Sequence, residues 1–177
     1  EEEFAFVKAF DWSADSKKIA FIRFDESEVP EFSMSIFQKE LYPKVETFKY
    51  PKAGEKNAVV SLHIYDVASQ TKKDVNLGNY SDFYIARMQW TNDANVLSAQ
   101  VLNRHQDNLD LLFIDGTTAA AKVVLNEKDK AYIDVTDNLT FLKDNSFIWT
   151  SEKDGFNHIY LYDKTGDRKS TRLNSSH

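Results

Sequence analysis

The 177-residue sequence contains no cysteine, only five glycines and three prolines, and no long apolar run. Without cysteine it can form neither a disulfide framework nor a thiolate metal site or nucleophile. A membrane-spanning helix needs about 18 consecutive apolar residues, and residues 1–3 are all glutamate, the opposite of the basic start of a secretory signal. We therefore expect no membrane span in this chain.

The chain also has fewer basic than acidic residues. The chain has 22 Lys and Arg against 28 Asp and Glu, a net charge of −6. Binding of nucleic acid requires a clustered basic surface, so we expect no nucleic-acid partner. Glycine-rich phosphate loops and metal-ligand spacings are also missing, and the sequence predicts no cofactor and no metal site.

Nucleophilic catalysis lacks its usual sequence signal. None of the five glycines brackets a serine in the Gly-x-Ser-x-Gly pattern of α/β-hydrolases. His63 and His158 fall beside or within expected strands, His105 falls in a hairpin loop and His177 in the final segment, so we assign each a structural or solvated role. The sequence predicts no catalytic residue here, although 28 acidic residues leave chance carboxylate pairs open.

What the sequence does contain is aromatic residues and a repeat. Aromatic residues make up 14% of the chain, which favours β-strands. Three alternating apolar segments end at Asp66, Asp115 and Asp163, with spacings of 49 and 48 residues. A second mark keeps the same register, an aromatic residue followed three positions later by aspartate: Trp12 and Asp15, Trp90 and Asp93, and Phe141 and Asp144.

A period near 48 with about four short strands is typical of a β-propeller blade. The fold class is therefore predicted to be all-β, a partial β-propeller over residues 1–167 with about three four-stranded antiparallel blades. The repeated aspartates are expected to accept backbone N–H groups in turns, and the aromatic residues to pack between blades. Expected strands are 5–12, 17–25, 59–67 and 72–77, then 84–91, 95–103, 109–115 and 120–126, then 138–142, 146–151 and 157–163.

Two segments depart from the repeat. Residues 26–58 form a long insertion in the first blade, which is typical of a functional or assembly element and is expected to carry an extra hairpin. Residues 168–177 lose the alternating pattern, so we expect a disordered or non-native tail and no outer strand in the third blade. Because three blades cannot close a ring, the chain is interpreted as a fragment.

Several motifs occur together and in order over residues 1 to about 166. They are Glu1-Glu2-Glu3-Phe4, Trp12-Ser13-x-Asp15-x-Lys17-x-Ile19-Ala20-Phe21, Asp25-Glu26-x-Glu28-Val29-Pro30, Tyr50-Pro51-Lys52-Ala53-Gly54, Asn103-Arg104-x-Gln106-x-Asn108 and Ser151-Glu152-Lys153-Asp154-Gly155. This set resembles the propeller of dipeptidyl peptidase IV-like serine exopeptidases of the prolyl oligopeptidase clan. The resemblance implies an eight-bladed propeller that caps an α/β-hydrolase domain. That domain, which carries the serine, aspartate and histidine triad, is absent from this chain.

The resemblance also implies a substrate site. Glu2 and Glu3 match the pair that holds the substrate's free N-terminal ammonium, with Glu1 and Arg104 as candidate supporting residues. An α-amino group is largely charged at neutral pH, and charge-assisted hydrogen bonds to carboxylates are stronger than neutral ones. We call this pair of carboxylates the ammonium clamp. If it lies at a fixed distance from a nucleophile, only two substrate residues fit before the cleaved bond, and the product is a dipeptide. Asn103, Arg104 and Gln106 are interpreted as residues that order their loop through hydrogen bonds, with contact to the substrate cavity as the alternative.

For the parent protein the resemblance implies a serine-type dipeptidyl peptidase that cleaves after proline or alanine. This chain alone is expected to be inactive. Its partners would be peptides with a free N-terminus and, through the insertion, a second copy; Phe32, Phe37, Tyr42 and Phe48 are candidate dimer contacts, with a self-packed loop as the alternative. Animal members of this family rely on disulfides in this region, so the resemblance together with the lack of cysteine implies a bacterial enzyme, periplasmic or extracellular. A non-catalytic propeller scaffold and a tripeptide-releasing relative remain alternatives.

Overall fold

The computed structural model describes residues 4–5 and 8–172. Its described residues form strands and no helix, and they divide into unit 1, Glu1–Arg23 with Ser61–His177, and unit 2, Phe24–Val60. The strands are β1 Phe10–Trp12, β2 Lys18–Asp25, β3 Glu31–Ile36, β4 Lys44–Lys49, β5 Val59–Asp66, β6 Thr71–Asp74, β7 Phe83–Trp90, β8 Val96–Asn103, β9 Asn108–Asp115, β10 Ala121–Lys128, β11 Thr140–Phe141, β12 Phe147–Ser151, β13 His158–Tyr162 and β14 Arg168–Arg172.

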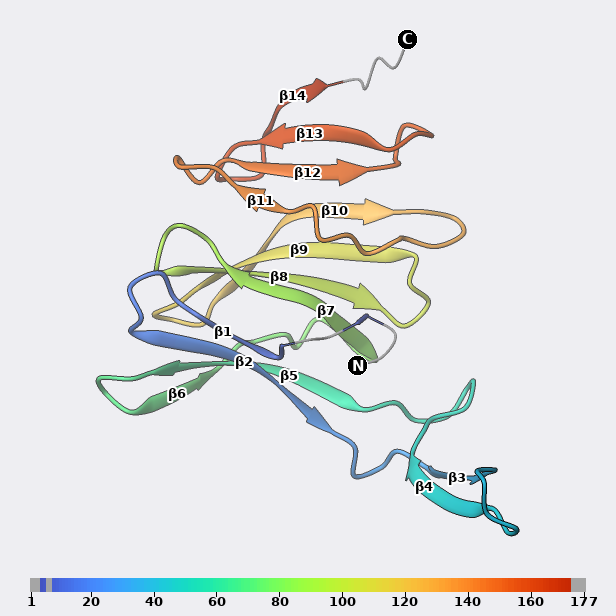
Figure 1. The fold of residues 1–177 in the computed structure, drawn as a ribbon. Coiled ribbons are helices and arrows are strands. Elements are labelled where there is room, and N and C mark those ends of the chain that lie inside the picture. The colour runs from blue at the N-terminus through green and yellow to red at the C-terminus, as the bar shows by residue number, and fades with distance from the viewer. Residues whose placement is uncertain (1–3, 6–7, 173–177) are drawn as a thin grey trace. The chain divides into compact units, whose positions relative to one another are not determined.

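Twelve of these strands form three four-stranded antiparallel sheets in chain order. The strand orders are β1-β2-β5-β6, β7-β8-β9-β10 and β11-β12-β13-β14, and the second and third sheets stack face on face in unit 1 (Figure 1). Consecutive four-stranded sheets of this kind are propeller blades. The predicted fold class is confirmed: the chain is a partial β-propeller, and we call its sheets blades one, two and three.

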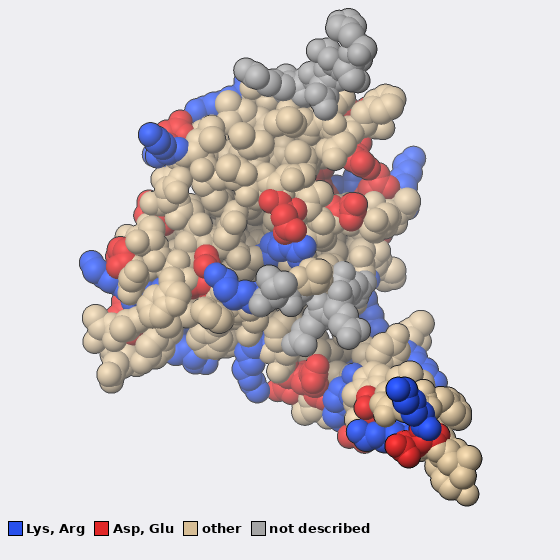
Figure 2. All heavy atoms as spheres, in the orientation of Figure 1, with Lys and Arg blue, Asp and Glu red and all other residues tan. Residues whose placement is uncertain are grey.

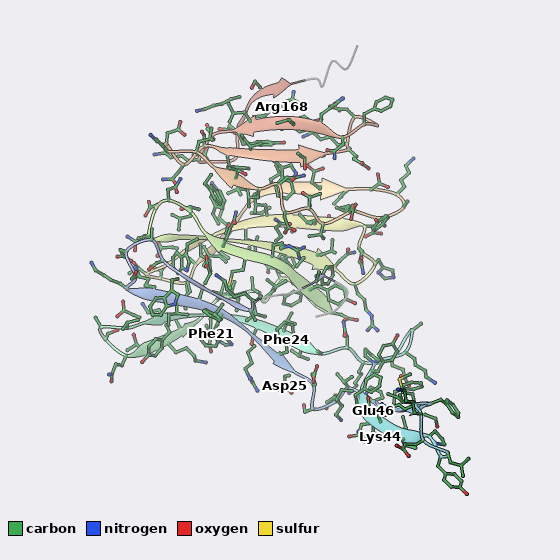
Figure 3. The ribbon with its side chains drawn as sticks, in the orientation of Figure 1. Phe21, Phe24, Asp25, Lys44, Glu46 and Arg168 are labelled. Carbon is green, nitrogen blue, oxygen red and sulfur yellow. The ribbon has the colours of Figure 1, made fainter. Side chains whose placement is uncertain are left out.

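The expectation that blade three lacks an outer strand is wrong for residues 168–172. Strand β14, which begins at Arg168 (Figure 3), pairs with β13 from Ile159↔Arg172 to Tyr162↔Arg168. An outer strand of a blade needs backbone partners on one side only, so it forms without the apolar alternation that the sequence analysis looked for. Residues 173–177 lie outside the described residues.

Blade two is the best-buried part of the molecule, because a blade lies against each of its faces. Six consecutive residues of β8, from Leu97 to Leu102, are buried, so this strand does not alternate between core and solvent. A sheet covered on both faces is expected to look like this. Its polar residues Ser98 and Gln100 are therefore buried with the apolar ones, at 1% and 3% exposure.

The repeated aspartates close the tight turns, as predicted. Asp15, Asp93 and Asp144 each accept a backbone N–H from two residues further on, at 3.2, 2.9 and 3.0 Å. Asp115 and Asp163 do the same between the third and fourth strands of their blades, accepting from Thr117 and Thr165, and Asp66 accepts from Ser69. These hydrogen bonds stabilise the charged carboxylate and lower the pKa of five of the aspartates: Asp15, Asp66, Asp115, Asp144 and Asp163.

Antiparallel pairing gives unit 1 two different ends. The aspartate-closed turns from first to second strand and from third to fourth strand gather at one end, which we call the turn end. Connections from second to third strand and from blade to blade gather at the opposite end, which we call the loop end. The loop end contains residues 75–82, 104–107, 129–139 and 152–157 (Figure 1).

The repeated aromatic residues pack as predicted in two blades and not in the first. Trp90 is 8% exposed, and its Nε1 donates to the Asp11 carbonyl of blade one at 3.1 Å. Phe141 of blade three packs against Phe113 of blade two with ring centroids 5.9 Å apart. Trp12, in contrast, is 47% exposed, because it lies in blade one, which has a neighbouring blade on one face only in this chain.

Unit 2 contains the predicted extra hairpin, strands β3 and β4. They pair from Glu31↔Lys49 to Ile36↔Lys44, and Lys44 and Glu46 are labelled on β4 in Figure 3. Phe32, Phe48 and Tyr50 form an aromatic cluster with centroids 5.9 to 6.1 Å apart. This cluster supplies the small core of the hairpin.

Candidate functional site

The predicted site residues are divided between described and undescribed parts of the chain. Glu1, Glu2 and Glu3 lie outside the described residues. Arg104 lies at the loop end, in the connection between β8 and β9, where its Nη1 donates to Asp82 at 2.9 Å. The carboxylate of Asp82 is the main cause that raises the pKa of the Arg104 guanidinium.

Phe4, the first described residue after the glutamates, is fixed in unit 1. Its side chain is 8% exposed and belongs to the core cluster between blades two and three. The ring lies 5.1 Å from that of Tyr84 on β7, and the carbonyl oxygen accepts a hydrogen bond from Arg87 Nη1 at 2.7 Å. Side chain and backbone of Phe4 are thus both held by blade two.

Arg87 connects three separate segments. Its Nη1 also donates to the Ala86 carbonyl at 2.7 Å, and its Nε donates to Asp137 Oδ1 at 2.5 Å. Asp137 belongs to the connection between blades two and three at the loop end. The Arg87 guanidinium lowers the pKa of the Asp137 carboxyl, so this carboxylate stays charged and the arginine remains fixed beside Phe4.

A second hydrogen bond orders the connection from blade one to blade two. Tyr80 donates its hydroxyl to Asp110 Oδ2 at 2.7 Å. Burial, followed by the neighbouring Asp110 carboxylate, raises the pKa of Tyr80, so the phenol keeps its proton and remains a donor. Together with the ion pair of Arg104 and Asp82, this bond ties the connection between β6 and β7 to blade two.

Arg87 and Asp137 were not among the residues predicted from the sequence. Neither belongs to a repeated motif, and Arg87 is separated from Phe4 by 83 positions and from Asp137 by 50. Only the fold brings the three residues together. An arginine in a strand that is otherwise well buried is the one signal that could have drawn attention to it.

The structure also places three side chains in the order of a Ser-His-Asp relay. In blade one, Ser61 and His63 Nε2 are 2.8 Å apart, and His63 Nδ1 lies 2.7 Å from Asp74 Oδ1. His63 is 5% exposed, stacks on Phe21 at 5.0 Å, and stands directly opposite Asp74 in the β5–β6 ladder. Of the three side chains only His63 is buried, and that of Asp74 is 68% exposed. We interpret them as a cross-strand hydrogen-bond network that helps to pair β5 with β6, since acyl transfer needs an oxyanion hole as well as these three groups.

Charge on the surface is mixed. On the face shown in Figure 2, basic and acidic side chains of the described residues are interspersed over unit 1. No group of three or more His, Asp or Glu in the described part of the chain is arranged to hold a metal ion. Among the same residues there is no helix long and apolar enough to cross a bilayer.

Comparison with known proteins identifies the family. The family model for the dipeptidyl peptidase IV (DPP IV) N-terminal region matches residues 1–175. The chain belongs to this family. Among curated relatives, a probable dipeptidyl-aminopeptidase B from Coccidioides posadasii is 28% identical over 99% of the chain, and dipeptidyl aminopeptidase B from Saccharomyces cerevisiae is 29% identical over 100% of it.

Solved structures agree with this dipeptidyl peptidase IV N-terminal assignment. The crystal structure of Porphyromonas gingivalis dipeptidyl peptidase 4 matches 99% of the chain with a TM-score of 0.91 and 41% identity. A putative dipeptidyl aminopeptidase IV from Bacteroides ovatus matches 92% with a TM-score of 0.79 and 28% identity. The chain spans 22% of the length of these two curated relatives, and 25% and 23% of the P. gingivalis and B. ovatus chains.

Proposed function

We propose that this chain supplies substrate recognition and active-site access in a serine-type dipeptidyl aminopeptidase that releases dipeptides after proline or alanine. In this proposal Glu2 and Glu3 hold the free ammonium of the substrate, Glu1 and Arg104 support them, and the catalytic triad lies elsewhere in the full-length protein. Membership of the dipeptidyl peptidase IV N-terminal family supports the reaction class.

The observation that carries the proposal is the anchoring of Phe4. A clamp for an ammonium group works only if its carboxylates start from a fixed backbone, because an exposed, mobile ion pair is worth only about 0–1 kcal/mol. Phe4 directly follows the glutamates, is buried, and has its carbonyl held by Arg87. The described residue nearest to the clamp is therefore rigidly attached to blade two.

The decisive experiment uses the full-length protein and a chromogenic Gly-Pro substrate. Its cleavage is compared with that of the same substrate acetylated on its amine, and the comparison is repeated for Glu2→Gln and Glu3→Gln. We expect cleavage to require the free amine and to collapse in both variants, whereas Glu46→Gln on the hairpin should cleave normally. Activity that ignores the amine and both substitutions would refute the clamp.

We also propose that the insertion contributes to a homodimer of the full-length protein. Phe32 and Phe48 pack in the aromatic cluster of the hairpin, but Phe37 and Tyr42 are 81% and 80% exposed, and neighbouring Leu41 is 89% exposed. Three large apolar side chains in water at one hairpin tip favour burial by a partner. Replacing Phe37 and Tyr42 with serine should shift the full-length protein from dimer to monomer in light scattering; an unchanged mass would contradict this.

A further inference from the structure

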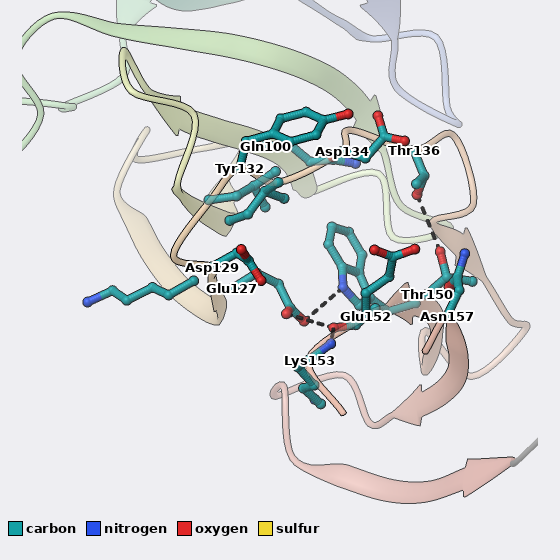
Figure 4. A pocket seen from close by; sticks show the side chains of 15 residues that line it. Gln100, Glu127, Asp129, Tyr132, Asp134, Thr136, Thr150, Glu152, Lys153 and Asn157 are labelled. Carbon is teal, nitrogen blue, oxygen red and sulfur yellow. Dashed lines mark hydrogen bonds between the residues drawn. The ribbon is translucent and has the colours of Figure 1, made fainter. Parts of the chain in front are cut away.

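A small pocket opens at the loop end between blades two and three (Figure 4), with a volume of about 90 Å³. This is well above the roughly 15 Å³ that a cavity needs to hold one water molecule, so the pocket has room for several waters or for one small planar head group. Its floor comes from strands β8, β10 and β12, and its rim from residues 129–136 and 150–157. The lining includes Gln100, Glu127, Tyr132, Asp134, Trp149 and Glu152.

The floor of the pocket contains hydrogen-bond acceptors that are deeply buried. Glu127 is 8% exposed, and its two carboxylate oxygens accept from Trp149 Nε1 at 3.1 Å and from Ser151 Oγ at 2.7 Å. Gln100 is 3% exposed, and its Oε1 has no hydrogen-bond donor among the described residues. A buried acceptor without a donor is costly, so the floor of this pocket calls for a ligand that donates.

The charge of the pocket is negative. Asp129, Asp134 and Glu152 add three carboxylates around Glu127, against two lysines. One of these, Lys153, is turned to other partners: its Nζ lies 2.9 Å from the hydroxyl of Tyr162 and 4.0 Å from the ring centroid of Tyr160, neither of which lines the pocket. One of the two lysine charges of the lining is therefore already engaged outside the pocket.

We propose that this pocket binds a guanidinium group, presented by an arginine side chain of a peptide. A guanidinium offers five N–H donors in one plane and no acceptor, which matches an acceptor-lined, acidic floor. The aromatic rings of Trp149 and Tyr132 in the wall suit a planar cation. Binding rests on the pocket alone, whereas the identification of the ligand as a peptide side chain rests on the proposed function.

The position of the pocket agrees with a peptide ligand. Gln100 and Thr136 line this pocket and also a neighbouring one, which contains Arg87 and Asp137. The guanidinium pocket thus adjoins the network that fixes Phe4. A peptide bound through its N-terminus beside Phe4 would pass this pocket at the same end of the propeller.

The first test measures binding of N-acetyl-arginine amide to the full-length protein by calorimetry. This probe has no free α-amine, so it does not use the proposed ammonium clamp, and the two proposals fail independently. N-acetyl-citrulline amide, which is neutral and of nearly the same shape, is the matched control. We expect saturable binding of the arginine probe and at least about tenfold weaker binding of citrulline; equal binding of both, or none, would overturn the proposal.

Two variants locate the site. Glu127→Gln keeps an acceptor for Trp149 but removes the charge, and should weaken binding of the arginine probe about tenfold. Gln100→Leu removes the unpaired acceptor and should weaken binding without lowering the melting temperature. Glu46→Gln, on the hairpin, is the charge-matched control. Unchanged affinity in both pocket variants would place the ligand elsewhere, and if either fails to fold, the comparison of arginine with citrulline on the unaltered protein still decides.

Discussion

The turn end and the loop end of unit 1 use polar residues in opposite ways. At the turn end, aspartates at repeated positions accept backbone N–H groups within their own turns, as Asp115 does from Thr117 and Thr118 at 2.8 and 2.6 Å. At the loop end, polar contacts join segments far apart in the sequence, as Arg87 does with Phe4 and Asp137. The repeated aspartates of the turn end are thus satisfied within their own turns, whereas the Arg87 network of the loop end depends on the assembled fold.

Both ends also contain a pocket. The pocket at the turn end is the larger, at about 340 Å³, and is lined by Asp93, Asp115 and Asp144, each of which has one carboxylate oxygen bonded by the backbone of its turn. Each pocket contains a buried amide oxygen without a donor among the described residues, Asn145 Oδ1 at the turn end and Gln100 Oε1 at the loop end. The pocket at the loop end differs because its lining adds the buried carboxylate of Glu127 and the rings of Trp149 and Tyr132. The combination of groups in the lining, rather than volume, distinguishes a candidate site.

The largest expected effect on stability comes from replacing a glycine at the turn end, and a glycine at the loop end serves as its comparison. Gly166 and Gly155 have φ of +95° and +90°, so both disfavour a side chain. A Cβ at Gly166 would lie 2.2 Å from the Val124 carbonyl oxygen on β10, whereas one at Gly155 meets nothing within 4 Å. We expect Gly166→Ala to cost about 3 kcal/mol or more of unfolding free energy and Gly155→Ala about 1–2. Urea unfolding of both checks this, and equal losses would contradict the close approach of blade three to Val124.

Next in size is the removal of Arg87, which tests whether the loop end depends on long-range contacts. Arg87→Met leaves the carbonyls of Phe4 and Ala86 and the carboxylate of Asp137 without this donor, and should cost about 2 kcal/mol. Asp137→Asn should cost less, since both carbonyls keep the guanidinium. If Phe4 positions the clamp, Arg87→Met also raises KM for substrates with a free amine; a normal KM in a destabilised protein would separate stability from recognition.

A smaller effect is expected at the turn end from Asp115. Its pKa lies below the ordinary value of 3.8, chiefly because the backbone N–H groups of Thr118 and Thr117 bond to the charged form. A depressed pKa contributes stability that is present above about pH 4 and is lost as the pH falls through the folded-state pKa. Asp115→Asn should therefore be less stable than the original protein by about 1 kcal/mol at neutral pH, and the gap should close toward pH 3. Urea unfolding at several pH values measures this gap, and a constant gap would exclude the carboxylate charge as its source.

The sequence could predict contacts between residues that are close together in the chain, but not contacts between residues that are far apart in it. The turn end was predictable, because an aspartate and the N–H groups it binds are two to four residues apart and repeat with the blades. Strand β14 was not predicted for the opposite reason, because its contacts are not local in the sequence. Arg168–Arg172 pairs through its backbone with β13, and Lys169 lies 3.9 Å from Asp144, contacts that leave no mark in the local pattern.

Most of the loop end was not predictable. Arg87 and Asp137 meet only after blades two and three have stacked, and the burial of Gln100 follows from a strand covered on both faces. Trp12 illustrates the same limit, because its motif matches that of Trp90 while its exposure depends on what lies beside blade one. Only a motif already tied to a family, the hairpin with Arg104, pointed to this end.

The smallest effect on stability is expected at the ion pair of Arg104 and Asp82, and it separates the two roles left open for Arg104. The side chains are 27% and 51% exposed, and an exposed pair contributes only about 0–1 kcal/mol. If Arg104 only orders its loop, Arg104→Gln and Asp82→Asn should behave alike in melting and in cleavage of a Gly-Pro substrate by the full-length protein. If it supports the ammonium clamp, Arg104→Gln should change KM at an unchanged melting temperature while Asp82→Asn does not, because only the first removes a group that can reach the substrate.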